Sequence, residues 1–220
     1  MSMPNFRSNP SSRYSELILQ YQRLHLEGEP NLKLPSEKTF PGTSVFPQAT
    51  RIKSLIRRTG ACTLLDYGCG KGQQYEARSI EIPGEGTYET LQDYWDLDFI
   101  YCYDPAYPRF SKAPDFSVDG VICTDVLEHC PADDLGWIVE ELFSCADIFV
   151  FASVAGHPAK KLLPNGENAH CTQKSPEWWK GIFESVGSKS PRIVWELWHH
   201  VKNSQGGFDE VCVTSGPVSR

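Results

Sequence analysis

The stretch that decides the fold is Thr63-Leu64-Leu65-Asp66-Tyr67-Gly68-Cys69-Gly70-Lys71-Gly72. An apolar, strand-forming run leads into an acid, and three glycines then occupy every second position. Glycine allows tight turns and close approach of a ligand because it has no Cβ. Neither glycine register continues as the Gly-x-Gly-x-x-Gly of nicotinamide and flavin sites, and Lys71 lacks the following Ser or Thr of a phosphate-binding loop. The stretch therefore predicts a strand that ends in a ligand-binding turn of another kind.

Further runs along the chain have the same strand-forming character. The run at 63–67 and the next three runs along the chain are apolar on both faces. This pattern is typical of parallel strands covered by helices on both sides, whereas a half-exposed antiparallel strand would alternate. The additional runs lie at residues 99–103, 120–124, 148–152, 192–198 and 210–214.

Amphipathic segments separate these runs. Apolar residues at helical spacing predict helices at 14–26, 48–58 and 131–146, the last one beginning at Pro131. Ser175 as N-cap and Pro176 at the first helical position predict a further helix. Strands that alternate with helices predict an α/β fold with a mainly parallel sheet.

Length and composition limit the possible functions. The chain has 220 residues, a net charge of −7 and 40% hydrophobic residues, which fits one domain. The acidic balance disfavours binding to a nucleic acid backbone, which relies on Lys and Arg. The longest apolar stretch, at 148–156, is far shorter than the roughly 20 residues of a membrane span, and the N-terminus lacks a signal-peptide pattern. We therefore expect a cytoplasmic protein without a membrane partner, whose eight scattered cysteines are free thiols.

The acid-x-Gly-x-Gly-x-Gly motif resembles the first motif of the class I S-adenosylmethionine-dependent methyltransferases. Three more segments are similar to that family: 99–104 to its second strand and terminal acid, 120–129 to its fourth strand and following loop, and 148–155 to its fifth strand. The resemblance covers roughly residues 63–214. It implies a three-layer Rossmann-like sandwich around a mainly parallel, seven-stranded-type sheet with an antiparallel last strand.

The same resemblance implies the residues that bind S-adenosyl-L-methionine. Asp104 corresponds to the acid that binds the ribose hydroxyls, where charge-assisted hydrogen bonds are worth roughly 1.5–3 kcal/mol each. Asp66 corresponds to the acid that holds the ammonium group of the methionine moiety directly or through water, and the glycine backbone lies beneath the cofactor. The full expected set is Asp66, Gly68, Cys69, Gly70, Gly72, Asp104, Pro105, Thr124 and Asp125.

Two departures from the family pattern flank Asp104. The stretch from Gly72 to Asp104 is longer than one helix plus a turn requires, so we expect an insertion around 83–86. No apolar run lies between Asp104 and Gly120, so the third strand of the family and the helix after it are expected to be shortened or missing. The residues that flank adenine in the family therefore have no assignable counterparts here.

Catalytic candidates follow the fourth-strand segment. Asp125-x-x-Glu128-His129 and the later His170 resemble the metal-binding set of O-methyltransferases that act on the terminal ribose of small RNAs or on catechols, with Asp for the first Glu. Oxygen and imidazole ligands suit Mg²⁺ or Mn²⁺. Three alternatives stay open: a divalent metal at all four residues, general-base catalysis by His129 or His170 with Asp125 beside them, and purely structural roles.

The resemblance implies two regions: residues 1–60 as a tail and helical cap over the active site, and 61–220 as the S-adenosylmethionine-binding domain. The leading expectation is methyl transfer to an oxygen or nitrogen atom of a small-molecule acceptor. One alternative is a metal-dependent O-methyltransferase of an RNA 3′-terminal ribose or a catechol. The other is a non-catalytic module that binds the cofactor and a partner.

Overall fold

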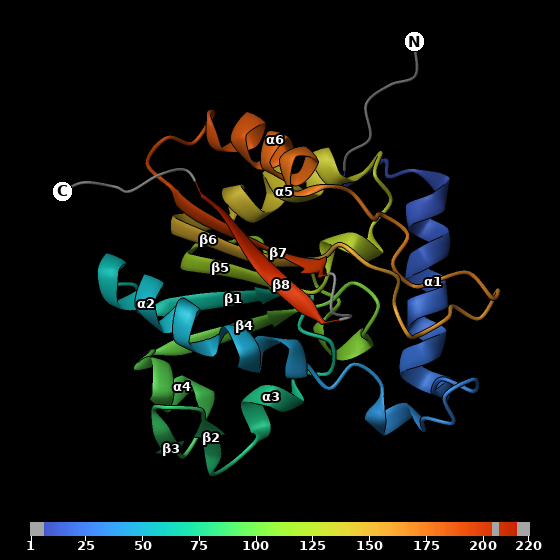
Figure 1. The fold of residues 1–220 in the computed structure, drawn as a ribbon, viewed down its shortest axis with the longest axis horizontal. Helices are drawn as coiled ribbons and strands as arrows, with labels where there is room; N and C mark the ends of the chain where they lie inside the picture. The colour runs from blue at the N-terminus through green and yellow to red at the C-terminus, as the bar shows by residue number, and fades with distance from the viewer. Residues whose placement is uncertain (1–6, 204–206, 215–220) are drawn as a thin grey trace.

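The computed structural model describes residues 7–203 and 207–214 and shows an α/β sandwich around one main sheet (Figure 1). The strand order is β4-β1-β5-β6-β7-β8, and all neighbouring strands are parallel except the antiparallel pair β7 and β8. The predicted Rossmann-like fold class is thereby confirmed. The strands of this sheet are β1 (Thr63–Tyr67), β4 (Phe99–Tyr103), β5 (Val118–Thr124), β6 (Ala146–Ala155), β7 (Val194–Lys202) and β8 (Phe208–Thr214).

Helices cover both faces of the sheet (Figure 1). Successive strand residues point to opposite faces, so Leu64 and Leu65 belong to two different hydrophobic cores. The predicted capping of the last helix is confirmed, because the side chain of Ser175 accepts a hydrogen bond from the backbone N–H of Trp178. One face carries α5 (Leu135–Ser144) and α6 (Pro176–Gly187), and the other carries α2 (Ala49–Thr59) and α4 (Leu91–Trp95).

The helix predicted from Pro131 begins later than expected, at Leu135. Pro131 instead opens a turn in which its carbonyl accepts a hydrogen bond from the backbone N–H of Asp134 at 3.0 Å. The carboxylate of Asp134 in turn accepts a hydrogen bond from the backbone N–H of Ser11 at 3.0 Å. The turn therefore contacts the residue that precedes α1, and Asp134 is the N-cap of α5.

The structure confirms that the third strand is missing, and this absence makes β4 an edge strand of the sheet. Residues 105–117, all of which the structure describes, contain only one short 3₁₀ turn. β4 is consequently the outermost strand, and Phe99 and Tyr101 are 51% and 36% exposed. The prediction that this run is buried on both faces is wrong for that reason. The expected insertion is confirmed as the hairpin of β2 (Ile80–Ile82) and β3 (Gly86–Tyr88).

The N-terminal region lies across the carboxyl ends of the strands. The helix α1 (Ser12–Glu27) stands beyond the arrowheads of β1 and β4 (Figure 1). Two 3₁₀ helices, Ser36–Lys38 and Thr43–Gln48, connect it to α2, which packs on the sheet face. Residues 1–6 of the expected tail lie outside the described residues. None of the described helices has the length and apolar character needed to cross a membrane.

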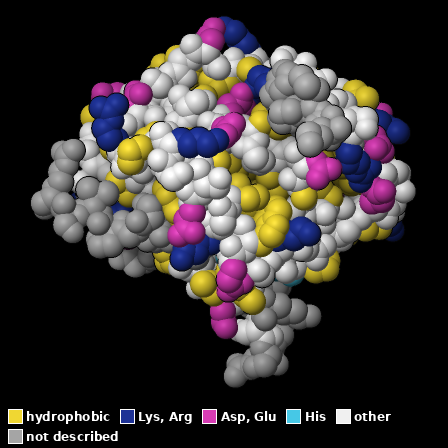
Figure 2. Space-filling view, turned by 90° about the horizontal axis from the view of Figure 1, so that it is seen from above, with side chains coloured by type: hydrophobic (Ala, Val, Ile, Leu, Met, Phe, Trp, Pro, Cys, Tyr) yellow, Lys and Arg dark blue, Asp and Glu magenta, His cyan; other side chains and the backbone are white. Residues whose placement is uncertain are grey.

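The surface above α5 and α6 mixes charges of both signs (Figure 2). Lys189 pairs with Glu140, and Lys180 pairs with Glu184. Exposed pairs of this kind contribute at most about 1 kcal/mol each. Charged residues of opposite sign thus alternate on the part of this face that the structure describes.

Candidate functional site

A cavity lies between α1 and the carboxyl ends of β1, β4 and β5. Its volume is about 140 Å³, which is below the roughly 300–1,000 Å³ typical of small-molecule sites. The chain leaves β1 for β4 on one side and returns to β5 on the other, so the cavity sits at the switch point where open α/β sheets bind ligands. Its walls include Gly68, Gly70, Asp104, Pro105, Thr124, Asp125 and His129, and from α1 Tyr14, Leu17, Ile18, Tyr21 and His25.

The glycine loop after β1 admits no side chain at two of its positions. The φ angles of Gly68 and Gly70 are +87° and +60°, in a region that other residues rarely adopt. A Cβ on Gly70 would lie 2.5 Å from the carbonyl oxygen of Phe40, and a Cβ on Gly68 would lie 2.4 Å from Val126 Cγ2. The loop is therefore packed between the segment after α1 and the loop after β5.

Asp104 is hydrogen-bonded to the glycine loop and also lines the cavity. Its Oδ2 accepts a hydrogen bond from the backbone N–H of Gly70 at 3.0 Å, and its Oδ1 accepts one from Ala106 at 2.9 Å. Burial raises the pKa of Asp104 to about 6, against the lowering effect of these bonds. A carboxylate has about four acceptor positions, so both oxygens can still accept hydroxyl groups of a ligand.

Asp66 occupies a different environment and is not among the residues that line the cavity. Its Oδ2 accepts hydrogen bonds from the hydroxyl of Tyr75 at 2.7 Å and from Nε2 of Gln74 at 3.0 Å. Burial raises its pKa to about 6. In the sheet register Asp66 pairs with Cys102, two residues before Asp104. Asp66 thus lies deeper in the sheet and supports the glycine loop from below.

Of the other residues predicted to bind the cofactor, some line the cavity and others do not. Lys71, which the sequence analysis did not single out as a ligand, is buried and donates a hydrogen bond to the carbonyl of His25 at 2.8 Å. It therefore joins the glycine loop to α1. Pro105, Thr124 and Asp125 line the cavity, whereas Cys69 and Gly72 do not.

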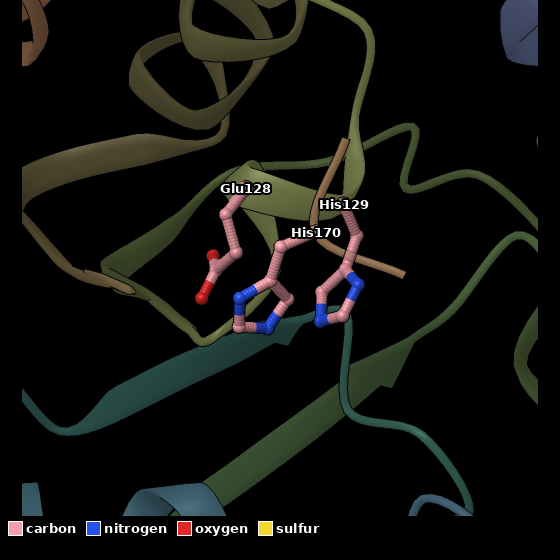
Figure 3. A group of neighbouring side chains, drawn as sticks. All are labelled: Glu128, His129 and His170. Carbon is pink, nitrogen blue, oxygen red and sulfur yellow. The ribbon is translucent and has the colours of Figure 1, made fainter. Parts of the chain in front are cut away.

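Glu128, His129 and His170 form a cluster beside the cavity (Figure 3). One potential ligand atom of each lies within 4.8 Å of the others. Glu128 and His129 belong to a 3₁₀ turn that follows β5, and His170 comes from the segment between β6 and α6. Figure 3 shows the three side chains projecting to the same side. Asp125, the fourth predicted member, is not part of this group.

The backbone fixes the protonation of both imidazoles. Nδ1 of His129 is 3.0 Å from the carbonyl oxygen of Ala169, and Nδ1 of His170 is 2.6 Å from that of His157. A carbonyl only accepts hydrogen bonds, so each Nδ1 carries the proton and each Nε2 keeps a lone pair. Burial and the neighbouring His170 lower the pKa of His129 to about 3, and burial lowers that of His170. Both rings are neutral and can bind a cation.

Each of the two acids near these rings has one buried oxygen without a hydrogen-bond partner. Oε1 of the fully buried Glu128 accepts a hydrogen bond from the backbone N–H of Ala155 at 2.8 Å, while its Oε2 has no partner. Oδ1 of Asp125 is also buried without a partner. Burial raises the pKa of both carboxyl groups, and Asp125 raises that of Glu128 further. Buried unpaired acceptors are costly, so the arrangement suits a bound cation.

The cap contributes a contact that the sequence analysis did not identify. The hydroxyl of Tyr21 lies 2.8 Å from Nδ1 of His129 and donates a hydrogen bond to the carbonyl of Ala169 at 2.8 Å. The only sequence signal is helical spacing, which puts Tyr14 and Tyr21 on one face of α1.

No protein family, curated protein or solved structure matches this chain. Functional inference consequently depends on the residues and geometry of the cavity and of the neighbouring cluster.

Proposed function

We propose that this protein is an S-adenosylmethionine-dependent methyltransferase that acts on an oxygen or nitrogen atom of a small-molecule acceptor. The observation that carries the proposal is the carboxylate of Asp104, which is bonded to the backbone N–H of Gly70 at 3.0 Å, with both residues lining one cavity. An acid with free acceptor positions thus stands beside Gly68 and Gly70, which carry no side chains. This pairing supports the recognition of a ribose and the chain attached to it.

The chain's own residues would act mainly by orientation. The bound cofactor supplies an electrophilic methyl group, and an in-line transfer gains most of its rate from alignment of the two reactants. Asp104 would hold the ribose, while Leu17 and Ile18 on α1 cover the cavity and exclude water. The neutral imidazole of His129, which lines the cavity, can take up the proton that the acceptor loses, although a pKa of about 3 makes it a weak base. His170 is not among the residues that line the cavity.

Calorimetric titration of S-adenosylhomocysteine into the full chain tests this proposal. We expect saturable binding with one site per chain, and an absence of binding would contradict the proposal. A screen of acceptors that follows release of S-adenosylhomocysteine then separates an enzyme from a non-catalytic cofactor-binding module, because turnover of any acceptor excludes the latter.

A second candidate function is metal-dependent O-methylation of a ribose or catechol hydroxyl. The specific observation in its favour is the cluster of Glu128, His129 and His170, in which one potential ligand atom of each residue lies within 4.8 Å of the others. One carboxylate oxygen of Glu128 in this cluster has no hydrogen-bond partner. These three residues would hold the ion. A bound divalent metal would lower the pKa of a hydroxyl and orient it.

Electron paramagnetic resonance of Mn²⁺ tests this second candidate. The full chain is expected to bind one Mn²⁺, and His170→Gln is expected to bind it more weakly. Equal binding by the two proteins would place the ion elsewhere. Methyl transfer that is unchanged by chelators would also contradict the metal-dependent reaction.

A further inference from the structure

The hydroxyl of Tyr21 joins the cap helix α1 to His129 and to the backbone directly before His170. It lies 2.8 Å from Nδ1 of His129 and donates to the carbonyl of Ala169 at 2.8 Å. Nδ1 of His129 also faces that carbonyl, at 3.0 Å, so it carries a proton, and this single N–H is shared between the carbonyl oxygen and the Tyr21 oxygen. The three groups, which come from distant parts of the chain, form a closed ring of hydrogen bonds.

This ring of hydrogen bonds helps to orient the imidazoles of His129 and His170, and with them both Nε2 atoms. His129 is a member of it, and Ala169 directly precedes His170. Fixing the carbonyl of Ala169 therefore fixes the backbone from which His170 projects. The rings of Tyr21 and His129 meet edge to face with centroids 5.5 Å apart, and those of His129 and His170 meet in the same way at 4.7 Å.

We propose that Tyr21 is a positioning residue that couples the docking of α1 to divalent-metal binding at Glu128, His129 and His170. The inference rests on the metal-dependent form of the proposed function. Hydrogen bonds to the second nitrogen of a metal-binding histidine fix its tautomer and ring orientation, and losing one costs about 10–100-fold in metal affinity. By thermodynamic reciprocity, the metal strengthens the docking of α1 by the same factor that the docked helix strengthens metal binding.

Two substitutions on α1 separate this role from a general effect on docking. Tyr21→Phe keeps the aromatic ring and removes only the hydroxyl. Gln20→Ala removes a neighbouring contact to the same loop, since Oε1 of Gln20 accepts a hydrogen bond from the backbone N–H of Asn165 at 3.3 Å. Gln20 is not a member of the hydrogen-bonded ring or of the cavity wall.

The experiment is a Mn²⁺ titration of the full chain, followed by electron paramagnetic resonance, for the unmodified protein and both variants. We expect Tyr21→Phe to weaken Mn²⁺ binding about 10–100-fold and Gln20→Ala to change it less than about 3-fold. Hydrogen–deuterium exchange of the unmodified protein gives a second measurement that needs no variant. Saturating Mn²⁺ is expected to slow amide exchange in residues 12–27 and to have a smaller effect there in Tyr21→Phe.

Each outcome decides the question. Equal Mn²⁺ affinity in the unmodified protein and Tyr21→Phe overturns the role of Tyr21 while leaving the metal site intact. Equal losses in Tyr21→Phe and Gln20→Ala overturn it too, because helix docking alone would explain both. Absence of Mn²⁺ binding to the unmodified protein overturns the metal-dependent function and the coupling together, whereas binding of S-adenosylhomocysteine would then still support methyl transfer.

Discussion

Carboxylates at the amino ends of the strands and carboxylates at their carboxyl ends lie in opposite environments. We call these two sides of the sheet the amino edge and the carboxyl edge. At the amino edge, Oδ2 of Asp119 accepts hydrogen bonds from the backbone N–H groups of Cys62 and Thr63 and from the Thr63 hydroxyl. Burial alone would raise the pKa of Asp119, but these hydrogen bonds lower it. This acid joins the starts of β1 and β5, and the protein itself satisfies its charge.

At the carboxyl edge, burial raises the pKa values of Asp66, Asp104, Asp125 and Glu128. Two of these residues also keep a buried oxygen without a partner. Such groups weaken the folded state, and perturbed acids in a cavity are characteristic of functional sites. This contrast indicates that the acids at the carboxyl edge are placed to bind a ligand, whereas the acid at the amino edge stabilises the fold.

The largest expected effect is that of Glu128→Gln on metal binding. The variant keeps the oxygen that accepts from Ala155 and replaces the unpartnered oxygen by an uncharged group. We expect Mn²⁺ affinity to fall more than about 100-fold, beyond the roughly 10–100-fold cost of losing an outer hydrogen bond. The melting temperature at pH 8 should rise, because burial raises the pKa of Glu128 in the folded protein and this difference from the unfolded chain destabilises the folded state above the unfolded-state pKa. A lower melting temperature would show that the carboxylate serves the fold, and it would break the comparison of the two edges.

The next largest effect concerns the glycine loop. Gly70→Ala brings a Cβ to 2.5 Å from the Phe40 carbonyl, whereas Gly84→Ala, also at positive φ, meets nothing within 4 Å. We expect Gly84→Ala to cost about 1–2 kcal/mol through backbone conformation alone. Gly70→Ala should cost more and should also weaken binding of S-adenosylhomocysteine. Urea unfolding and calorimetry measure the two effects. Equal costs and unchanged binding would contradict the close packing of the cap on the loop.

A smaller effect, with a defined pH dependence, is expected for Asp66→Asn. The pKa of Asp66 is about 6 in the folded protein and about 3.9 in an unfolded chain. The folded state therefore keeps a proton that the unfolded state has lost, and stability falls as the pH rises through this window. The penalty, on the order of 3 kcal/mol at pH 8, is absent from the variant. We expect a melting temperature several degrees higher at pH 8 and about half that gain at pH 5.

Asp119→Asn is expected to have the smallest effect, with the opposite sign. The folded-state pKa of Asp119 is lowered, so its contribution is present above the unfolded-state pKa and is lost as the pH falls through the folded-state value. Replacing the charged acceptor costs about 1 kcal/mol at neutral pH and less in acid. Melting curves at pH 7 and pH 4 measure this difference. Stabilisation by Asp119→Asn would remove the contrast between the edges.

The order of the strands along the chain could be predicted because each is a short apolar run bounded by turn residues. The apolar run itself does not show the exposure of Phe99 and Tyr101, which follows from the missing third strand that the sequence also predicts. The sequence places Asp66 and Asp104 at the ends of two strands, and the resemblance gives both a role in cofactor binding. Only the parallel register shows that Asp66 pairs with Cys102 and so lies two positions deeper than Asp104.

The cluster of Glu128, His129 and His170 could be predicted from the sequence only in part. Glu128 and His129 are neighbours in the sequence, and the resemblance pointed to His170. Asp125, in contrast, lies outside this group, and its backbone has a φ of +54° directly after β5. The contact between Tyr21 and His129 spans 108 positions and arises only when α1 docks. No local pattern carries that information.

Binding of S-adenosylhomocysteine to Asp104→Asn and Asp119→Asn, measured by calorimetry beside the unmodified protein, tests the central claim most directly. Both variants replace a carboxylate that accepts backbone hydrogen bonds, one at each edge of the sheet. We expect Asp104→Asn to weaken binding roughly 10–100-fold, as the loss of charge-assisted bonds predicts, and Asp119→Asn to leave it unchanged. Equal affinities in all three proteins, or a loss confined to Asp119→Asn, would contradict the assignment of the carboxyl edge as the cofactor site.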